Sequence, residues 1–232
     1  MSSAKIVYVA SNAAVTMYLS NIVNGRYIPY NLIKNPPVFF HMPKTGGNSV
    51  GKFLSQRRIP VITITHNLRD PEYKMPCEVL SGMERSFCFV RNPWDRLVSA
   101  YYFLRNGGKH GLDKADFDEL LAGFKDFESF VMEGLSSDPG KLLGQIHLKP
   151  QVSWIKKQDG KLCINDTLKV EDMRAELIKY FMKFGLRMAG DMPFRNKSRR
   201  ERDYRKLYST EMVEVVSSVY CEDVETFGYS YE

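Results

Sequence analysis

The chain has 232 residues, of which 44% are hydrophobic and 26% charged, and a formal net charge of +6 at pH 7. This composition is ordinary for a globular protein, and the length is enough for one large α/β domain with a full core. No stretch approaches the roughly 18 consecutive apolar residues of a membrane span, which excludes such a span within these residues. An export signal is also not expected, because Ser11 and Asn12 interrupt the apolar run at 6–10. We expect residues 1–35 to be an N-terminal extension packed on a single domain at 36–232.

The first strand and helix predicted within this domain flank a short loop that contains two glycines. Residues 38–42 are a short apolar run after two prolines, which predicts a buried parallel strand. The sequence PKTGG at 43–47 ends that strand, and Asn48 or Ser49 is expected to cap the helix that follows. Apolar residues in that helix recur at the three- and four-residue spacing of a buried face.

This arrangement of strand, loop and helix favours the binding of an anion. It points free backbone N–H groups at a phosphate-like group, as helix N-termini do. Lys44 adds a positive charge, while Gly46 and Gly47 let the backbone approach a ligand closely. In nucleotide-hydrolase loops the lysine follows the glycines and precedes a hydroxyl residue that holds magnesium, whereas here the lysine comes first. The loop therefore predicts a phosphate or sulfate site that differs from that of a P-loop kinase.

Strands and helices alternate along the rest of the chain. We predict strands at 60–65, 86–90 and 162–164, and helices at 93–104, 114–123, 126–134, 145–154, 171–184 and 210–220. The alternation indicates an α/β fold with a central parallel sheet covered by helices on both faces. Ligands bind at the carboxyl ends of the strands in such sheets. Lys44, His66 and Arg91 each follow a predicted strand, so we expect them to converge on one crevice.

A second anion signature lies at residues 88–104. Asn92 is expected to cap the helix there, with a proline in the first turn and Asp95 returning a capping bond. Ser99 lies opposite the apolar side of this helix, at a spacing that puts it on the same side as Asn92. Arg91 and Ser99 are therefore both able to face one ligand beside the helix.

The pattern of cysteines indicates whether a protein works in a reducing or an oxidising compartment of the cell. The four cysteines are scattered and form no CxxC pair, so neither a zinc site nor a disulfide framework is expected. Cys88 lies in an apolar run and is predicted to be a buried free thiol. This pattern favours a cytoplasmic location, with a lumenal location as the alternative if an anchor precedes the chain.

Positive charge is concentrated in residues 195–206. Seven basic and two acidic residues lie there, which gives this segment five of the six net charges of the chain. Such a segment is typical of a site for an anionic ligand, and a solvated helix face is the alternative interpretation. The mixed charges at 114–119 are predicted to be a solvated helix face.

The two anion signatures together closely resemble the cofactor motifs of sulfotransferases that use 3′-phosphoadenosine-5′-phosphosulfate (PAPS). The motifs are PKTGGNS at 43–49 and RNPWDRLVSAYY at 91–102. The resemblance is to the branch that contains heparan sulfate 2-O- and 6-O-sulfotransferases, other carbohydrate sulfotransferases and their bacterial relatives. Later segments also resemble landmarks of this branch: HLKPQVSWI (147–155), LKVEDM (168–173), NKSRR (196–200) and YCEDVETFGY (220–229). The resemblance covers residues 36 to 230 and implies a P-loop-like sulfotransferase fold.

The resemblance implies a role for each matching residue. The first loop would bind the 5′-phosphosulfate of PAPS through these residues: Lys44, Thr45, Gly46, Gly47, Asn48 and Ser49. Arg91 and Ser99 match the arginine and serine that hold the 3′-phosphate, and arginine suits a bidentate contact with phosphate. Lys197 and Ser198, in the basic segment, would close over the same phosphate. No metal is implied, since the chemistry of this family does not require magnesium.

Sulfuryl transfer needs in-line attack by an acceptor hydroxyl and a base that takes the hydroxyl proton. Lys44 is placed to stabilise charge on the leaving phosphate. His66 resembles the catalytic histidine of the 2-O- and 6-O-transferases, and a polar loop residue is its alternative interpretation. His147 is the alternative base, although it is predicted, like Gln151, to contact the acceptor. His41, inside the first strand, is predicted to be a packed core residue.

The sequence therefore predicts a PAPS-dependent sulfotransferase that acts on a hydroxyl, most simply of a sugar, and releases adenosine 3′,5′-bisphosphate. A nucleotide- or nucleic-acid-binding protein without transfer activity is a second hypothesis, disfavoured because the basic segment has no recognisable nucleic-acid motif. A P-loop kinase is a third, disfavoured by the position of the lysine. The chain is short, and we expect it to have neither the membrane anchor nor the stem of the Golgi enzymes. The acceptor therefore stays open between a polysaccharide and a smaller molecule, such as a small glycan, a glycolipid or a metabolite.

Overall fold

The computed structural model describes residues 5–10, 13–18, 34–65, 76–109, 111–187 and 203–231. The chain forms two compact units, which we describe separately. Unit 1 consists of residues 1–90 and 154–195, and unit 2 of residues 91–153 and 196–232.

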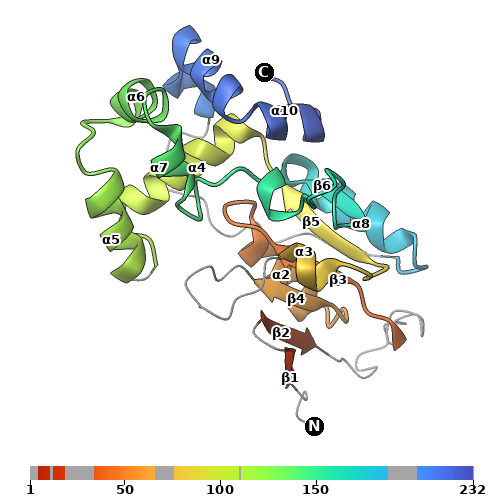
Figure 1. Cartoon of the computed structure of the whole chain (residues 1–232). Helices are drawn as coiled ribbons and strands as arrows, with labels where there is room; N and C mark the ends of the chain where they lie inside the picture. Colours follow the sequence, from red (N-terminus) through yellow and green to blue (C-terminus); the bar gives the residue numbers. More distant parts are fainter. Residues whose placement is uncertain are drawn as a thin grey trace. The chain divides into compact units, whose positions relative to one another are not determined.

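Unit 1 contains a six-stranded sheet in the order β1-β2-β4-β3-β5-β6 (Figure 1). The strands are β1 Lys5–Ala10, β2 Ala13–Tyr18, β3 Val38–His41, β4 Ile62–Thr65, β5 Ser86–Val90 and β6 Asp166–Lys169. The strands β4, β3, β5 and β6 are parallel, which confirms the predicted α/β fold with a central parallel sheet. The pairs β1–β2 and β2–β4 are antiparallel, so part of the N-terminal extension adds two strands to one edge of this sheet.

The strand β3 lies between β4 and β5, in register with both. Phe40 is paired with Ile64 on one side and with Cys88 on the other. Because these strands are parallel, their carboxyl ends lie at the same edge of the sheet, where the loop after β3 begins. The strands predicted at 38–42, 60–65 and 86–90 are confirmed.

The strand predicted at 162–164 is wrong. Leu162 makes only an isolated bridge with Lys156, and the fourth parallel strand is β6, which begins at Asp166. A run of three apolar residues fits the pattern of a short buried strand, but the pairing with β5 uses the residues that follow it.

Side chains that alternate along β3 and β5 face opposite sides of the sheet. On one side, Phe39 and Phe87 stack at 5.2 Å between ring centroids, in a core shared with two helices. These helices are α2, Gly47–Gln56, and α8, Met173–Met182. On the other side, the ring of Phe40 lies 6.1 Å from that of Trp154. Both faces of the sheet are therefore covered, as predicted.

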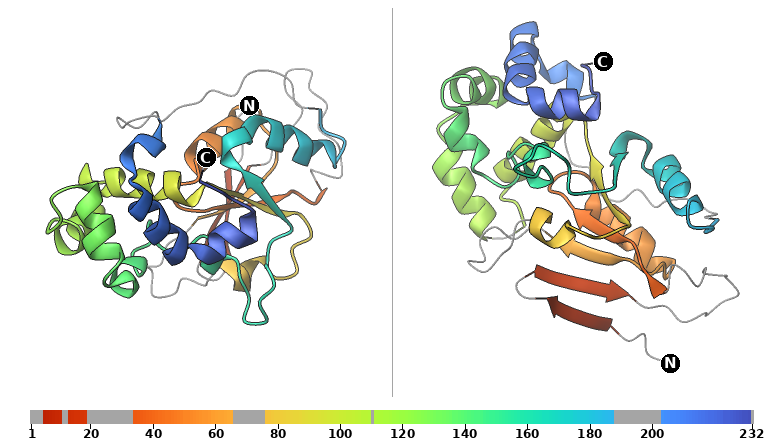
Figure 2. Two further views of the ribbon diagram at one scale, coloured as in Figure 1. Left: turned by 90° about the horizontal axis from the view of Figure 1, so that it is seen from above. Right: turned by 45° about the vertical axis from the view of Figure 1, so that its right-hand side comes forward.

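Unit 2 is helical. Its elements are α4 Pro93–Arg105, α5 Gly111–Leu120, α6 Phe127–Ser129, a π-helix Phe130–Leu135, α7 Pro139–Leu143, a 3₁₀-helix Tyr204–Leu207, α9 Thr210–Val219 and α10 Cys221–Phe227. Tyr101 of α4 stacks on Phe130 at 5.2 Å between centroids. The helix α9 lies against α4 (Figure 2). The Trp94 indole of α4 donates to the carbonyl of Val213 in α9 at 3.2 Å. An aromatic core centred on α4 thus holds this unit together.

One helix prediction for unit 2 is corrected and another is confirmed. The predicted helix at 145–154 is mostly turns, because the Gln145 side chain accepts hydrogen bonds from the backbone of His147 and Leu148, and Pro150 has no N–H to continue a helix. A short 3₁₀-helix, Val152–Trp154, is all that the structure has there. The predicted final helix at 210–220 is α9, and a further helix, α10, follows it.

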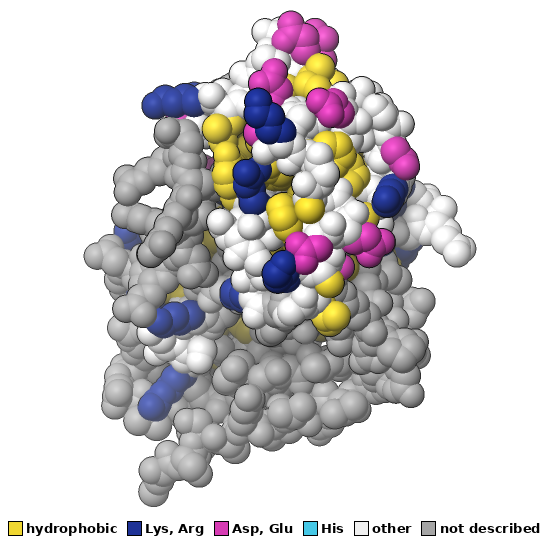
Figure 3. Space-filling view, turned by 90° about the vertical axis from the view of Figure 1, so that its left-hand side faces the viewer, with side chains coloured by type: hydrophobic (Ala, Val, Ile, Leu, Met, Phe, Trp, Pro, Cys, Tyr) yellow, Lys and Arg dark blue, Asp and Glu magenta, His cyan; other side chains and the backbone are white. Residues whose placement is uncertain are grey.

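The mixed charges predicted to be solvated lie on α5. Lys114 and Asp118 are exposed and form an ion pair one turn apart, at 2.7 Å. On the face drawn in Figure 3, basic and acidic side chains are interspersed. Within the described residues, no helix is long and apolar enough to cross a membrane.

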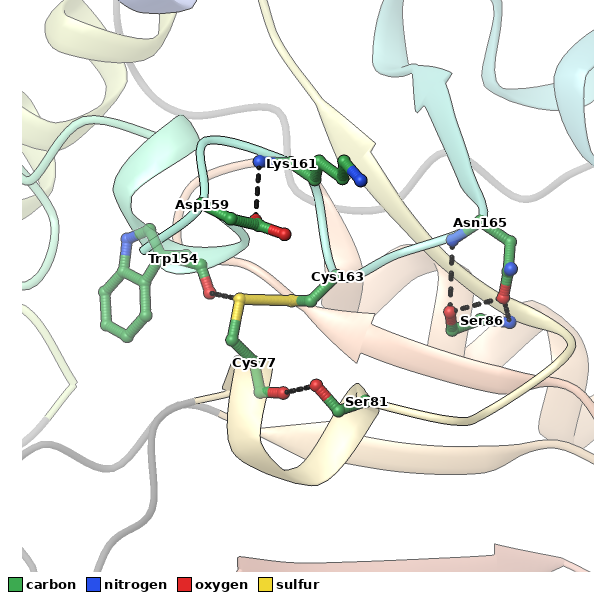
Figure 4. The surroundings of a disulfide bond; sticks show 8 residues. All are labelled: Cys77, Ser81, Ser86, Trp154, Asp159, Lys161, Cys163 and Asn165. Carbon is green, nitrogen blue, oxygen red and sulfur yellow. Dashed lines mark hydrogen bonds between the residues drawn. A yellow bond between two sulfur atoms is a disulfide. The ribbon is translucent and has the colours of Figure 1, made fainter. Parts of the chain in front are cut away.

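The expectation that no disulfide forms is wrong, because Cys77 and Cys163 are joined (Figure 4). Cys77 belongs to the short helix α3, Pro76–Leu80, and Cys163 precedes β6. The two cysteines are 86 positions apart, so their spacing contains no signal for the bond. Cys88 is a buried free thiol, as predicted, and burial raises its pKa well above the usual value.

Candidate functional site

The anion loop, residues 42–49, turns tightly at the carboxyl end of β3. Lys44 and Gly46 both have left-handed backbones, with φ of 67° and 75°. The buried hydroxyl of Thr45 donates to the carbonyl of Met42 at 3.1 Å, across the turn. These features close the loop on itself and direct the chain into α2.

The helix α2 begins two or three residues earlier than the sequence predicted. Its N-cap is Gly46, and no side chain caps it, so the expected capping by Asn48 or Ser49 is wrong. Ser49 and Val50 instead donate their backbone N–H groups to the Gly46 carbonyl, at 2.9 and 3.3 Å. A glycine cap in the left-handed region suits this sharp turn, since other residues are strained there.

Backbone N–H groups are available at this helix end. Within the described part of the chain, the N–H groups of Thr45, Gly46, Gly47 and Asn48 donate to no backbone carbonyl. The dipole of the ten-residue helix α2 adds partial positive charge at the same point. Lys44, which is half-buried, adds a full charge beside it. The anion loop thus has the geometry that binds phosphate or sulfate groups at helix N-termini.

Close packing requires a glycine at position 47 of this loop, and a left-handed backbone favours one at position 46. A Cβ on Gly47 would lie 1.9 Å from the imidazole of His41, and one on Gly46 would lie 2.8 Å from the terminal methyl of Met173. His41 also stacks on Phe39, with ring centroids 6.0 Å apart. His41 is half-buried, so it packs on Phe39 and on the loop without being the core residue that was predicted, and its ring supports the first residue of α2. The position of His41, directly before the loop, is the signal that could have indicated this contact.

The second signature begins unit 2, where Arg91 directly follows β5. Asn92 is the N-cap of α4, as predicted, and its side chain accepts from the backbone of Trp94 and Asp95 at 3.1 and 3.5 Å. Pro93 is the first residue of the helix. This cap fixes the backbone that leaves Arg91 and enters α4.

The side chain of Arg91 forms an ion pair with Asp95, one turn along α4. The Asp95 carboxylate, expected to return a capping bond, accepts from Nε and Nη2 of Arg91 at 2.7 and 2.6 Å. Ser99 follows Asp95 by one further turn and is partly exposed. Asp95 and Ser99 therefore lie one turn apart on one side of α4, the spacing at which helix side chains are neighbours. Arg91 precedes the helix and reaches this side through its ion pair with Asp95.

The backbone of Arg91 is held by Gln151. The Arg91 N–H donates to Oε1 of Gln151 at 2.8 Å, and Nε2 of Gln151 donates to the Arg91 carbonyl at 2.8 Å. Gln151 is fully buried. The amide of Gln151, predicted to contact an acceptor, thus makes its hydrogen bonds inside unit 2.

Asp223 of α10 supports Gln151 and is a residue that the sequence analysis missed. It accepts from the backbone of Gln151 and Val152 at 2.8 and 2.7 Å, and from Nε2 of Gln151 at 3.3 Å. It is buried on the same side of α10 as Phe227, four residues later, and that spacing is the signal that could have placed it. We call Arg91, Asp95, Gln151 and Asp223 the arginine network.

A second arginine lies close to this network. Arg96 of α4 is 2% exposed, and burial lowers its pKa while the nearby carboxylate of Asp223 acts in the opposite direction. Burial likewise raises the pKa of Asp223, and the charge of Arg96 and the backbone bonds from Val152 and Gln151 oppose this. The opposite charges of Arg96 and Asp223 therefore compensate one another, whereas either charge buried alone would be destabilising.

His147, the alternative base, is buried in unit 2. Its Nε2 lies 3.4 Å from a carboxylate oxygen of Asp113, and its ring meets that of Phe103 edge-on at 4.7 Å. Only 7% of the residue is exposed. His147 therefore joins α5 to the 145–148 turn.

Three predicted site residues lie outside the described residues: His66, Lys197 and Ser198. Their roles stay predictions from the sequence. In the part of the chain that the structure describes, no three His, Cys, Asp or Glu side chains are grouped to hold a metal ion.

The fold is that of an α/β protein in which the N-terminus of a helix follows the first parallel strand and an arginine follows a neighbouring strand. A family model described as the sulfotransferase family matches residues 38–230. The chain therefore belongs to the sulfotransferase family, whose members are enzymes that transfer a sulfuryl group, usually from PAPS, to hydroxyl-bearing acceptors. The comparisons with curated proteins and with solved structures gave no match.

Proposed function

We propose that this sulfotransferase uses PAPS as its donor and a carbohydrate or glycoconjugate hydroxyl as its acceptor. The observation that supports the donor is the open helix end of the anion loop, with four adjacent N–H groups and Lys44 beside them. Such an end matches a multiply charged phosphosulfate. The acceptor class rests on the resemblance of the motifs to carbohydrate sulfotransferases.

The anion loop binds the 5′-phosphosulfate end of the donor. Lys44, Ser49 and the backbone from Thr45 to Asn48 surround the group whose charge increases as the reaction proceeds. A bond forms between the acceptor oxygen and sulfur, and the bond from sulfur to the bridging phosphate oxygen breaks. The N–H groups of the loop and the positive charge of Lys44 would stabilise the negative charge that develops on that oxygen.

The 3′-phosphate end is bound by Arg91 and Ser99. Arg91 presents a planar fork of donors, which fits two phosphate oxygens. Ser99, on the same side of α4, adds a hydroxyl. Lys197 and Ser198 are proposed to contact the same phosphate, since their basic segment has five of the six net charges.

His66 is the proposed base that removes the proton of the acceptor hydroxyl. It follows the carboxyl end of β4, which pairs with β3. His147 is less suited, because its ring is buried between Asp113 and Phe103. The burial of His147 and Gln151 also does not support the predicted direct contact of these residues with the acceptor.

The disulfide bears on where the enzyme works. Disulfides persist in oxidising compartments and are rare in the reducing cytosol. The bond between Cys77 and Cys163 therefore favours the lumenal alternative over the cytoplasmic location, and we propose an oxidising compartment.

Calorimetric titration with adenosine 3′,5′-bisphosphate, compared with ATP and with duplex DNA, tests the donor assignment. The bisphosphate should bind the unaltered chain most tightly. Lys44→Ala and Arg91→Ala should each weaken that binding by about 1.5–3 kcal/mol, the value of a lost charge-assisted hydrogen bond. Lys52→Ala is the matched control, since Lys52 is an exposed lysine of α2 and should leave binding unchanged. Unchanged affinity in both test variants would exclude the PAPS site.

A further inference from the structure

One side chain holds both hydrogen-bonding groups of the Arg91 main chain. The amide of Gln151 accepts from the Arg91 N–H and donates to the Arg91 carbonyl, each at 2.8 Å. Gln151 is 60 positions away in the sequence and 0% exposed. Together with the Asn92 cap, these bonds fix the backbone from which the guanidinium projects.

Gln151 is itself fixed from behind by Asp223. The carboxylate of Asp223 accepts from the Gln151 backbone at 2.8 Å and from its Nε2 at 3.3 Å. This second bond determines which end of the Gln151 amide faces the Arg91 carbonyl, because only the NH₂ end can donate to both acceptors. The amide is therefore oriented before any ligand arrives.

From this geometry we propose that Gln151 is a positioning residue for the 3′-phosphate, acting through Arg91. The inference rests on the proposed role of Arg91 in binding that phosphate. A long arginine side chain loses less conformational freedom on binding when its backbone is already fixed, so more of the contact energy appears as affinity. The effect is specific to ligands with a 3′-phosphate, whereas a purely structural role of Gln151 would affect every ligand alike.

The test measures the affinities of adenosine 3′,5′-bisphosphate and adenosine 5′-monophosphate, which lacks the 3′-phosphate. In Gln151→Met, a change of similar volume that removes both bonds to Arg91, the bisphosphate should bind roughly 3–10-fold more weakly, as expected for one or two lost hydrogen bonds. The monophosphate should bind as it does to the unaltered chain. Gln151→Asn, which keeps an amide one methylene too short to hold both groups, should give a smaller change in the same direction.

Gln145→Met is the matched control. Gln145 is also buried, and its amide also bonds to backbone groups and to a carboxylate of unit 2, yet none of these belongs to Arg91. The control should lower stability without altering the ratio of the two affinities. An equal loss for both nucleotides in the Gln151 variants, or no loss for either, would overturn the positioning role.

A measurement on the unaltered chain covers the case in which the Gln151 variants do not fold. The Arg91 amide should exchange slowly with solvent deuterium both before and after the bisphosphate is added, whereas amides 45–48 should gain protection only on binding. Fast exchange at Arg91 in the free protein would overturn the inference. A failure of the proposed function is recognised separately, since the unaltered chain would then not prefer the bisphosphate over the monophosphate.

Discussion

We propose that the anion loop and the arginine network both bind phosphate groups, but by different means. The anion loop is continuous in sequence and uses backbone N–H groups, two glycines and one lysine. The arginine network uses side chains from separate segments, with Gln151 60 positions from Arg91 and Asp223 a further 72 positions away.

This difference has consequences for tolerance to substitution. In the anion loop, the space around the backbone is what matters, so adding a methyl group is the damaging change. In the arginine network, a buried hydrogen-bonding side chain is what matters, and removing its polar group is the damaging change. The following predictions test this contrast, from the largest expected effect to the smallest.

The largest effect should come from a residue that belongs to neither region. His66→Ala should lower the rate of sulfuryl transfer by roughly 10²–10⁴-fold, the usual contribution of a general base. Binding of adenosine 3′,5′-bisphosphate should be unchanged, because both phosphate-binding regions are intact. Single-turnover transfer from PAPS and calorimetry measure the two quantities.

His147→Ala is the comparison for that experiment. It removes a buried ring packed on Phe103, so we expect lower thermal stability with the rate of transfer largely preserved. An inactive His147→Ala beside a nearly normal His66→Ala would reverse the assignment of the base.

The disulfide lies in the unit that contains the anion loop, and its removal should affect that unit first. Cys77→Ser or Cys163→Ser should lower the free energy of unfolding by about 2–5 kcal/mol, the usual contribution of a native disulfide. Hydrogen exchange should accelerate at the amides of β3 and β5 more than at those of α4. Cys221→Ser, at an exposed free thiol, is the control and should change nothing. Equal acceleration in both units would show that they unfold together.

Gly47→Ala should damage the anion loop by steric overlap. The new Cβ would lie 1.9 Å from the imidazole of His41, so the N-terminus of α2 must move. We expect the free energy of unfolding to fall by about 1–3 kcal/mol and nucleotide binding to weaken. Gly51→Ala in the same helix has open space and should instead stabilise by about 0.4–1 kcal/mol. Adding His41→Ala to Gly47→Ala should recover part of the loss. No recovery would mean that the His41 ring is not what requires the glycine.

The smallest effect is expected for Asp95→Asn. The ion pair of Arg91 with Asp95 has side chains 16% and 18% exposed, and pairs near the surface contribute about 0–1 kcal/mol. Affinity for adenosine 3′,5′-bisphosphate, measured by calorimetry, should therefore change less than about fivefold. A loss as large as that of Gln151→Met would show that Arg91 is positioned through its side chain as much as through its backbone.

Much of the fold was predictable because consecutive residues encode it. The three strands at 38–42, 60–65 and 86–90, the helix that Asn92 caps and the α/β class follow from apolar periodicity and from proline, glycine and capping residues. The membership of residues 38–230 in the sulfotransferase family agrees with the motif pair at 43–49 and 91–102. The cap of α2 was predicted at the wrong residue, because a glycine in the left-handed region replaced the polar caps that usually serve there.

The sequence by itself determined the anion loop, since its strand end, glycines, lysine and helix start are neighbours along the chain and interact through local hydrogen bonds. Only the tertiary structure decided the bond between Cys77 and Cys163, the pairing of β6 with β5, and the roles of Gln151 and Asp223. Each of these joins segments separated by 60 or more positions, and no local pattern specifies which distant group a buried amide or thiol will meet. Such contacts form where packing of the core brings the segments together, after the cost of closing long loops has been met.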